Sequence, residues 1–319
     1  MRLKPGRPDL GAHADRFDVP AATGSFGVTF LGVSSLLFDD GEHALLTDGF
    51  FSRPSLLRVG LRTVAPDEQR IDAALGRLEL SGRLRAVLPV HTHVDHVLDS
   101  AVVAQRTGAA LVGGRSAANV GRGAGLPAEQ IRLTEPHQPM TFGSFTVTAV
   151  VSDHCPPDRY PGEITEPVVP PVKAAAYRCG EAWSLLVGHA GGRTALVQGS
   201  AGFVAGSLDG CTADVAYLGV GQLGVLDEQY IRDYWRHTVG AVGAREVVLT
   251  HWDDFFRPLD QPLRALPYAA DDLDVTLRVL GRLADEQAVG LHLPTVWRRE
   301  NPWAASARAG AQFPAVDTS

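Results

Sequence analysis

Four residues of the types that bind metal ions lie within one hexapeptide, His-Thr-His-Val-Asp-His. Histidine is neutral enough near pH 7 to give a ring nitrogen to a metal, and aspartate gives an anionic oxygen. The apolar run 86–90 predicts a strand that ends at the hexapeptide, with His91 and His93 on one face because side chains alternate along a strand. That spacing predicts one metal held by His91 and His93. Asp95 and His96 fall on the turn that opens the next helix, where they would hold a second metal.

This hexapeptide after an apolar strand resembles the signature of the metallo-β-lactamase superfamily. The resemblance implies an α/β fold of four layers, an αβ/βα sandwich in which two mixed sheets pack face to face with helices outside. It also implies one or two zinc ions that activate water, with manganese or iron as alternatives. The opening of the chain agrees, because similar openings that end in a strand finishing Thr47-Asp48 are common in that family.

Two further histidines follow apolar strands. His154 comes after the run 145–151, and His251 comes directly after 246–250. Together with the hexapeptide they give two sets of three ligands: His91, His93 and His154 for one metal, and Asp95, His96 and His251 for the other. Three protein ligands with an open fourth position for water is the arrangement of catalytic zinc sites.

One position departs from the resembled family. Where that family usually carries a carboxylate that bridges two metals, this sequence has Ser200. A neutral hydroxyl is a poor bridging ligand, so the number of metals, one or two, stays open. Ser200 would either hydrogen-bond a metal-bound water or cap the following turn.

Two acidic residues are candidates for supporting the ligands. Asp153 precedes His154 and would fix the tautomer of an imidazole, the alternative being an exposed acid in a turn. Asp48 ends a strand at the same predicted edge, and in similar proteins this acid supports the site. Asp99 falls in the first turn of the next helix, where the helix dipole alone explains an acid.

A glycine motif invites a different interpretation. Residues 219–224 read Gly-Val-Gly-Gln-Leu-Gly, which has the form of a dinucleotide-binding fingerprint. The expected ribose-binding acid is missing, because the next strand ends in Thr250-His251. We therefore expect no nucleotide-binding residues here, and a glycine-rich turn passing close to the metal site.

The periodicity predicts two similar halves. Strands are expected at 26–31, 35–38, 44–48, 85–90, 110–113 and 145–151, and then at 184–187, 194–197, 214–218, 246–250 and near 288–293. Helices are expected from Pro66 onward and at 95–107, 227–239 and 270–286. The order of strands, β-α-β, strands, β-α-β fits the sandwich.

Around this single domain, residues 25–298, we expect an extended arm at 1–24 and a mobile tail at 299–319. The segment 156–176 is rich in proline and too long for an ordinary connection. Long loops beside a site often act as lids or as walls for the substrate.

Composition limits the partners. The chain has 319 residues, is 45% hydrophobic and 20% charged, and has a net charge of −7. That charge argues against a nucleic-acid partner, which requires clustered Lys and Arg. No apolar run approaches the ~20 residues of a membrane span, and the N-terminus lacks the apolar core of a signal peptide. Three scattered cysteines predict the reducing cytoplasm. The oligomeric state is left open, a homo-oligomer included.

The function predicted from these residues is metal-assisted hydrolysis, most simply with zinc. Asp95 is expected to orient the attacking water and accept its proton. A small ester, lactone, amide or phosphodiester is the expected substrate class. The alternatives are a di-iron redox enzyme on the same fold, or a metal-binding scaffold without turnover.

Overall fold

The computed structural model describes residues 4–80 and 82–305. Its first half begins with an antiparallel meander and continues as a parallel sheet. The strands are β1 (Gly27–Phe30), β2 (Leu36–Asp39), β3 (Ala44–Thr47), β5 (Leu84–Leu88), β6 (Ala110–Gly113) and β7 (Ile131–Leu133). The longer helices of this half are α2 (Glu68–Leu78), α4 (Ser100–Thr107) and α5 (Arg115–Gly123).

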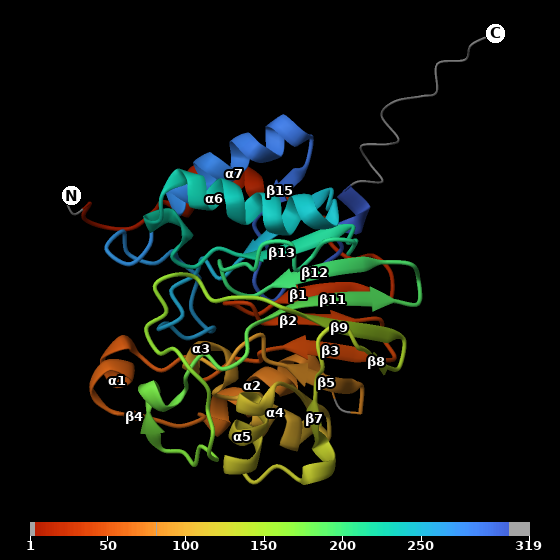
Figure 1. Cartoon of the computed structure of the whole chain (residues 1–319), viewed down its shortest axis with the longest axis vertical. Helices are drawn as coiled ribbons and strands as arrows, with labels where there is room; N and C mark the ends of the chain where they lie inside the picture. Colours follow the sequence, from red (N-terminus) through yellow and green to blue (C-terminus); the bar gives the residue numbers. More distant parts are fainter. Residues whose placement is uncertain (1–3, 81, 306–319) are drawn as a thin grey trace.

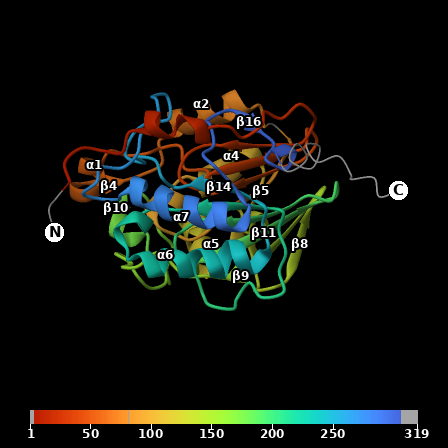
Figure 2. The ribbon, with the colours of Figure 1, turned by 90° about the horizontal axis from the view of Figure 1, so that it is seen from above.

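The second half repeats this plan. Antiparallel strands come first and a parallel set follows. They are β8 (Pro139–Phe142), β9 (Phe145–Val151), β11 (Trp183–His189), β12 (Thr194–Gln198), β13 (Val215–Gly219), β14 (Glu246–Thr250) and β15 (Gly290–His292). The helices are α6 (Glu228–Trp235) and α7 (Leu273–Gln287), which run side by side in both views (Figures 1 and 2).

The described residues form four layers. One seven-stranded sheet has the order β16-β1-β2-β3-β5-β6-β7, in which β16 is Arg299–Glu300, and the other has the order β15-β14-β13-β12-β11-β9-β8. Figure 1 shows both sheets in the middle, α6 and α7 on one outer side, and α2, α4 and α5 on the other. Apolar residues of both sheets form one buried cluster between them, as where the rings of Phe38 and Tyr217 lie 5.7 Å apart. The predicted four-layer sandwich is confirmed, and burial of these facing surfaces is the main force that holds the layers together.

The helix predicted at 95–107 is two helices, α3 (Val94–Val97) and α4. Asp99 lies at the break. Its buried carboxylate accepts hydrogen bonds from the backbone N–H groups of Phe51 and Ser52, at 2.7 and 2.6 Å, and makes no helix cap. The dipole explanation for Asp99 is therefore replaced by a tertiary one, because this acid anchors the segment after β3.

The arm was expected to be extended, but residues Leu10–Arg16 form a 3-10 helix. Before it, Arg7 reaches the second half of the chain, where Nη1 donates to Asp254 Oδ2 at 3.0 Å. The arm is therefore part of the packed structure.

The tail also differs from the expectation where it is described. Residues Arg299–Glu300 form β16, which pairs with β1 at the edge of the first sheet. Residues 306–319 of the expected tail lie outside the described residues.

The proline-rich segment has little regular structure. Residues Val172–Lys173 form β10, which pairs with β4 (Thr63–Val64), and a single 3-10 turn follows at Ala174–Ala176. Neither β4 nor the preceding helix α1 (Leu56–Leu61) was anticipated. In Figure 1 these elements lie at the same end of the molecule as α3. No helix in the described ranges combines the length and the apolar character needed to cross a membrane.

Candidate metal centre

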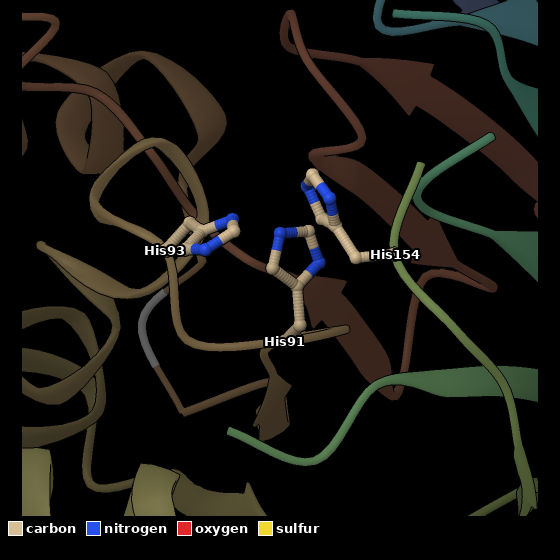
Figure 3. Close-up of side chains that lie close together, drawn as sticks. All are labelled: His91, His93 and His154. Atoms are coloured by element: carbon tan, nitrogen blue, oxygen red, sulfur yellow. The ribbon is translucent and has the colours of Figure 1, made fainter. Parts of the chain in front are cut away.

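The ends of β5 and β9 bring three histidines together. His91 and His93 follow β5, and His154 follows β9. Their ring centroids are 4.9 Å apart for His91 and His93, 5.0 Å for His91 and His154, and 4.5 Å for His93 and His154. Figure 3 shows the three rings converging on a common space. One potential ligand atom from each residue lies within 4.8 Å of the others.

Asp95, His96 and His251 form a second cluster with the same spacing of ligand atoms. Asp95 Oδ2 lies 3.7 Å from His96 Nε2 and 3.4 Å from His251 Nε2. The two clusters share a wall, since the rings of His91 and His96 are 3.9 Å apart. The structure therefore brings together all six residues that the sequence nominated as ligands.

The nitrogens of these rings suit a cation. His91 Nε2 and His96 Nε2 are buried, and neither has a hydrogen-bond partner among the described residues. An orphaned buried polar atom is costly unless something else satisfies it, and a metal ion does so. Burial and the neighbouring His96 hold the pKa of His91 well below its usual value, and burial with His93 lowers the pKa of His154 to about 4. Both rings are therefore neutral at pH 7, with the lone pair that a metal needs.

Asp48 controls the orientation of His96. It is fully buried, and its Oδ2 accepts hydrogen bonds from His96 Nδ1 at 2.9 Å and from Ser34 Oγ at 2.6 Å. Its Oδ1 accepts one from Val90 N at 2.9 Å. Burial disfavours protonation of His96, but Asp48 and Asp95 outweigh it and raise the pKa of the ring. With the proton on Nδ1, Nε2 is the nitrogen that faces the second cluster.

The backbone is strained where the halves meet beside this cluster. Val33, Asp48 and His251 have positive φ angles of 53°, 52° and 58°, a region that non-glycine residues seldom occupy. His251 N donates to Val33 O at 2.6 Å, which ties two of these positions together. Such strain persists only where the surroundings impose it, and it often accompanies functional sites.

No family model matches the sequence, and no curated protein sequence is significantly similar to it. Solved structures are similar in fold. CmlA, a diiron β-hydroxylase from Streptomyces venezuelae, gives a TM-score of 0.54 at 13% identity over 88% of this chain, which spans 54% of CmlA. A candidate metal-dependent hydrolase from Parabacteroides distasonis gives 0.52 at 11% identity, covering 88% of this chain and 99% of that one. The metallo-β-lactamase fold protein YhfI from Bacillus subtilis gives 0.45 at 17% identity, covering 88% and 95%.

The described residues of this chain thus share their overall fold with CmlA and with the Parabacteroides protein, each at a TM-score above 0.5.

Ser200 lies just beyond β12. Its Oγ accepts a hydrogen bond from Cys155 N at 3.0 Å, and its carbonyl oxygen accepts one from Gln198 Nε2 at 3.1 Å. Ser200 therefore anchors the segment that carries His154, a contact that the sequence did not indicate.

The suggestion that Asp153 fixes an imidazole tautomer is wrong. Its Oδ1 accepts a hydrogen bond from the backbone N of His154 at 2.8 Å, and the residue itself is exposed. The ring of His154 is held by another group, since its Nδ1 donates to Cys155 O at 2.8 Å. That bond leaves Nε2 of His154 as the nitrogen available to a metal.

Asp158, which was not among the predicted site residues, lies against the first cluster. Asp158 Oδ1, on the proline-rich segment, lies 3.2 Å from His93 Nε2. With Cys179 these residues make a third group of neighbouring potential ligands. The one sign of Asp158 in the sequence is that an acid stands four residues after His154. It lies in a segment without helix or strand periodicity, so its position could not be predicted.

The glycine motif forms the expected turn beside the second cluster. A Cβ on Gly221 would lie 2.7 Å from His251 Nδ1 and 3.0 Å from His251 O, so glycine permits the close approach. The backbone N–H groups of Gln222 and Gly224 donate to the Asp271 carboxylate at 3.0 and 3.1 Å. These two amides of the glycine motif are thus already bonded to a carboxylate.

Proposed function

We propose that this protein is a metal-dependent hydrolase, with zinc as the simplest metal. The observation that carries the proposal is the pair of adjacent three-residue clusters, in which His91 Nε2 and His96 Nε2 are buried without hydrogen-bond partners among the described residues. A bound divalent ion would polarise the substrate and activate a water molecule.

The residues of the chain have separate roles in this proposal. His91, His93 and His154 hold one metal, and His96 and His251 with Asp95 hold the other. Both described contacts of Asp95 involve Oδ2. We assign Oδ1 to accept the proton of the attacking water, which is the general-base role. Burial works against ionisation of Asp95, but His96 and His251 outweigh it and hold its pKa far below the usual value, so the carboxylate is charged at pH 7.

A small, uncharged and partly apolar ester, lactone or amide fits the surroundings best. Aromatic rings flank both clusters, with Tyr160 6.4 Å from His93 and Phe255 5.6 Å from His251 between centroids. The proline-rich segment has two positive charges that could attract an anionic substrate. One of them, Lys173, already donates to the carbonyl oxygen of Leu61. An anionic phosphodiester would also meet the Asp158 carboxylate beside His93, so it ranks below the neutral substrates.

Ser200 bears on how many metal ions the two clusters hold. Without a bridging carboxylate at this position, the two ions would share less negative charge, and we propose unequal affinities for the two clusters. A di-iron redox enzyme remains the second candidate because the fold is similar to that of CmlA, a diiron β-hydroxylase. A metal-binding scaffold without turnover is the third.

Elemental analysis of the purified protein tests the proposal, followed by assays on a panel of lactones, esters, amides and phosphodiesters. We expect one or two zinc ions per chain and turnover that ends when a chelator removes them. His93→Ala should abolish turnover and lower metal content. The control is His137→Asn, because His137 is exposed and has a positive φ that asparagine tolerates. Full turnover in metal-free protein would contradict the proposal, and two irons per chain would favour the redox candidate.

We further propose a cytoplasmic location, because the three cysteines are scattered, and no nucleic-acid partner, because the net charge is −7. Cell fractionation and an electrophoretic shift assay with DNA and RNA would test them.

A further inference from the structure

The histidines of the two clusters differ in how they are supported. In the second cluster, Asp48 receives the Nδ1 proton of His96, and a carboxylate thus sets the tautomer. In the first cluster, the Nδ1 proton of His154 goes to a backbone carbonyl. His93 is the ring of the first cluster that has a carboxylate against it, and its Nε2 also lies 3.4 Å from the carbonyl oxygen of Tyr160. Asp158 Oδ1 lies 3.2 Å from His93 Nε2, and the exposed fractions of the two side chains are 22% and 10%.

We infer that Asp158 is a positioning residue for the first metal: together with the carbonyl oxygen of Tyr160, it keeps the proton of His93 on Nε2 and so leaves Nδ1 to the metal. A carboxylate can only accept, so the nitrogen that faces it must carry the proton. The other nitrogen then has the free lone pair. This inference rests on the proposed function, because it assumes that the three-histidine cluster binds a metal.

The backbone holds Asp158 in place for this task. Its Oδ1 also accepts from Tyr160 N at 2.9 Å, which closes a turn. Cys179 N donates to Tyr160 O at 2.9 Å, and Thr92 N, between the two motif histidines, donates to Cys179 O at 2.8 Å. The proline-rich segment is therefore linked to the hexapeptide by backbone hydrogen bonds through one residue, Cys179. A carboxylate fixed in this way is preorganised and loses little entropy when the metal binds.

The negative charge of Asp158 is a second reason to expect this residue to strengthen metal binding at the first cluster. The ligands of the first cluster, His91, His93 and His154, are all neutral, and Ser200 adds no charge where a bridging carboxylate is usual. Asp158 brings one negative charge beside a dication in a largely buried site, where electrostatic attraction is strong. Removing such an outer carboxylate commonly weakens metal binding by about 10- to 100-fold.

The test is a Co²⁺ titration of the full chain, followed by its visible absorption bands, with a competing chelator to set the affinity. It is done in a His251→Ala background so that the three-histidine cluster is the one complete site. Asp158→Asn keeps the size of the side chain and removes its charge. The matched control is Glu166→Gln, the same change of charge at an exposed position on the same segment.

We expect Asp158→Asn to weaken Co²⁺ binding by about 10- to 100-fold and to shift the absorption bands, and Glu166→Gln to do neither. Asp158→Glu, which keeps the carboxylate, should recover part of the affinity. Equal affinity and spectra for Asp158→Asn and the control would overturn the inference while leaving the proposed function standing. A loss of the same size in Asp158→Glu would also overturn it, because the cause would then be packing. If the parent protein binds no Co²⁺ at all, both the proposed function and this inference fail.

Discussion

Replacing Asp48 by asparagine should empty the second metal site while leaving the fold in place. Asparagine has the same shape, so its carbonyl oxygen can still accept from Val90 N, as Asp48 Oδ1 does at 2.9 Å. Its NH₂ group then faces His96 Nδ1, where Asp48 Oδ2 accepted a proton. To avoid two facing donors, His96 must move its proton to Nε2, the nitrogen that points at Asp95. A protonated Nε2 cannot bind a metal, so the site loses a ligand without losing a side chain.

The size of the effect follows from these contacts. Loss of an orienting carboxylate costs about 10- to 100-fold in metal affinity, which is roughly 1.4–2.8 kcal/mol. The metal-free protein should lose about 1–3 kcal/mol of folding stability, because a charge-assisted hydrogen bond becomes a neutral one. That loss can leave the domain folded, since small domains are stable by about 5–15 kcal/mol.

The assay is metal content per chain after dialysis against buffered Zn²⁺, with denaturant unfolding of the metal-free protein beside it. The matched control is Asp39→Asn, another buried acid, which pairs with the start of β3 at the far end of that strand from Asp48 and accepts hydrogen bonds from Arg83. Asp48→Asn should lose one metal equivalent, and Asp39→Asn should lose none. If Asp48→Asn bound metal at the second cluster with wild-type affinity, the tautomer argument for His96 would be refuted.

Three further outcomes follow from other parts of the structure. Gly221→Ala should displace the ring of His251 and lower occupancy of the second site in the same metal assay, because its Cβ would lie 2.7 Å from Nδ1; unchanged occupancy would contradict this. Asp253→Ala should destabilise the protein by about 3–5 kcal/mol in denaturant unfolding, because it leaves Arg53 charged, fully buried and unpaired. Burial opposes protonation of His292, but its two carboxylate partners outweigh it and raise its pKa. Its stabilising charge is present below pH ~6.5 and lost as the pH rises through the raised value, so His292→Gln should lower the melting temperature more at pH 5.5 than at pH 9, and an equal loss at both would count against it.

Much of the architecture could be predicted because it is written in local patterns. Apolar runs of strand length, glycine turns and helix-start signals gave the order of elements, and the order implied the sandwich. The ligand residues could be predicted for a related reason. Histidines at 91, 154 and 251 each follow an apolar run, and the ends of such strands meet at one edge of the fold.

Other features have no local pattern and needed the tertiary structure. The break before α4 depends on where Asp99 finds backbone donors, 48 and 47 residues away. The contact between His93 and Asp158 depends on the path of a proline-rich segment that has no periodicity, so an acid there could not be assigned to any ring. Asp153 was the nearer candidate in sequence, yet its carboxylate bonds to the adjacent backbone.

The sequence by itself determined which side chains could hold metal and which strands would carry them, because a strand end and a residue type are local facts. Only the tertiary structure decided which nitrogen of His96 and of His154 is free, since that depends on how the folded backbone places their partners. Asp48 lies 48 residues from His96, and Cys155 O lies beside His154 only because the backbone turns there. The proton on each imidazole, and hence the metal-binding face of the site, is set by that three-dimensional arrangement.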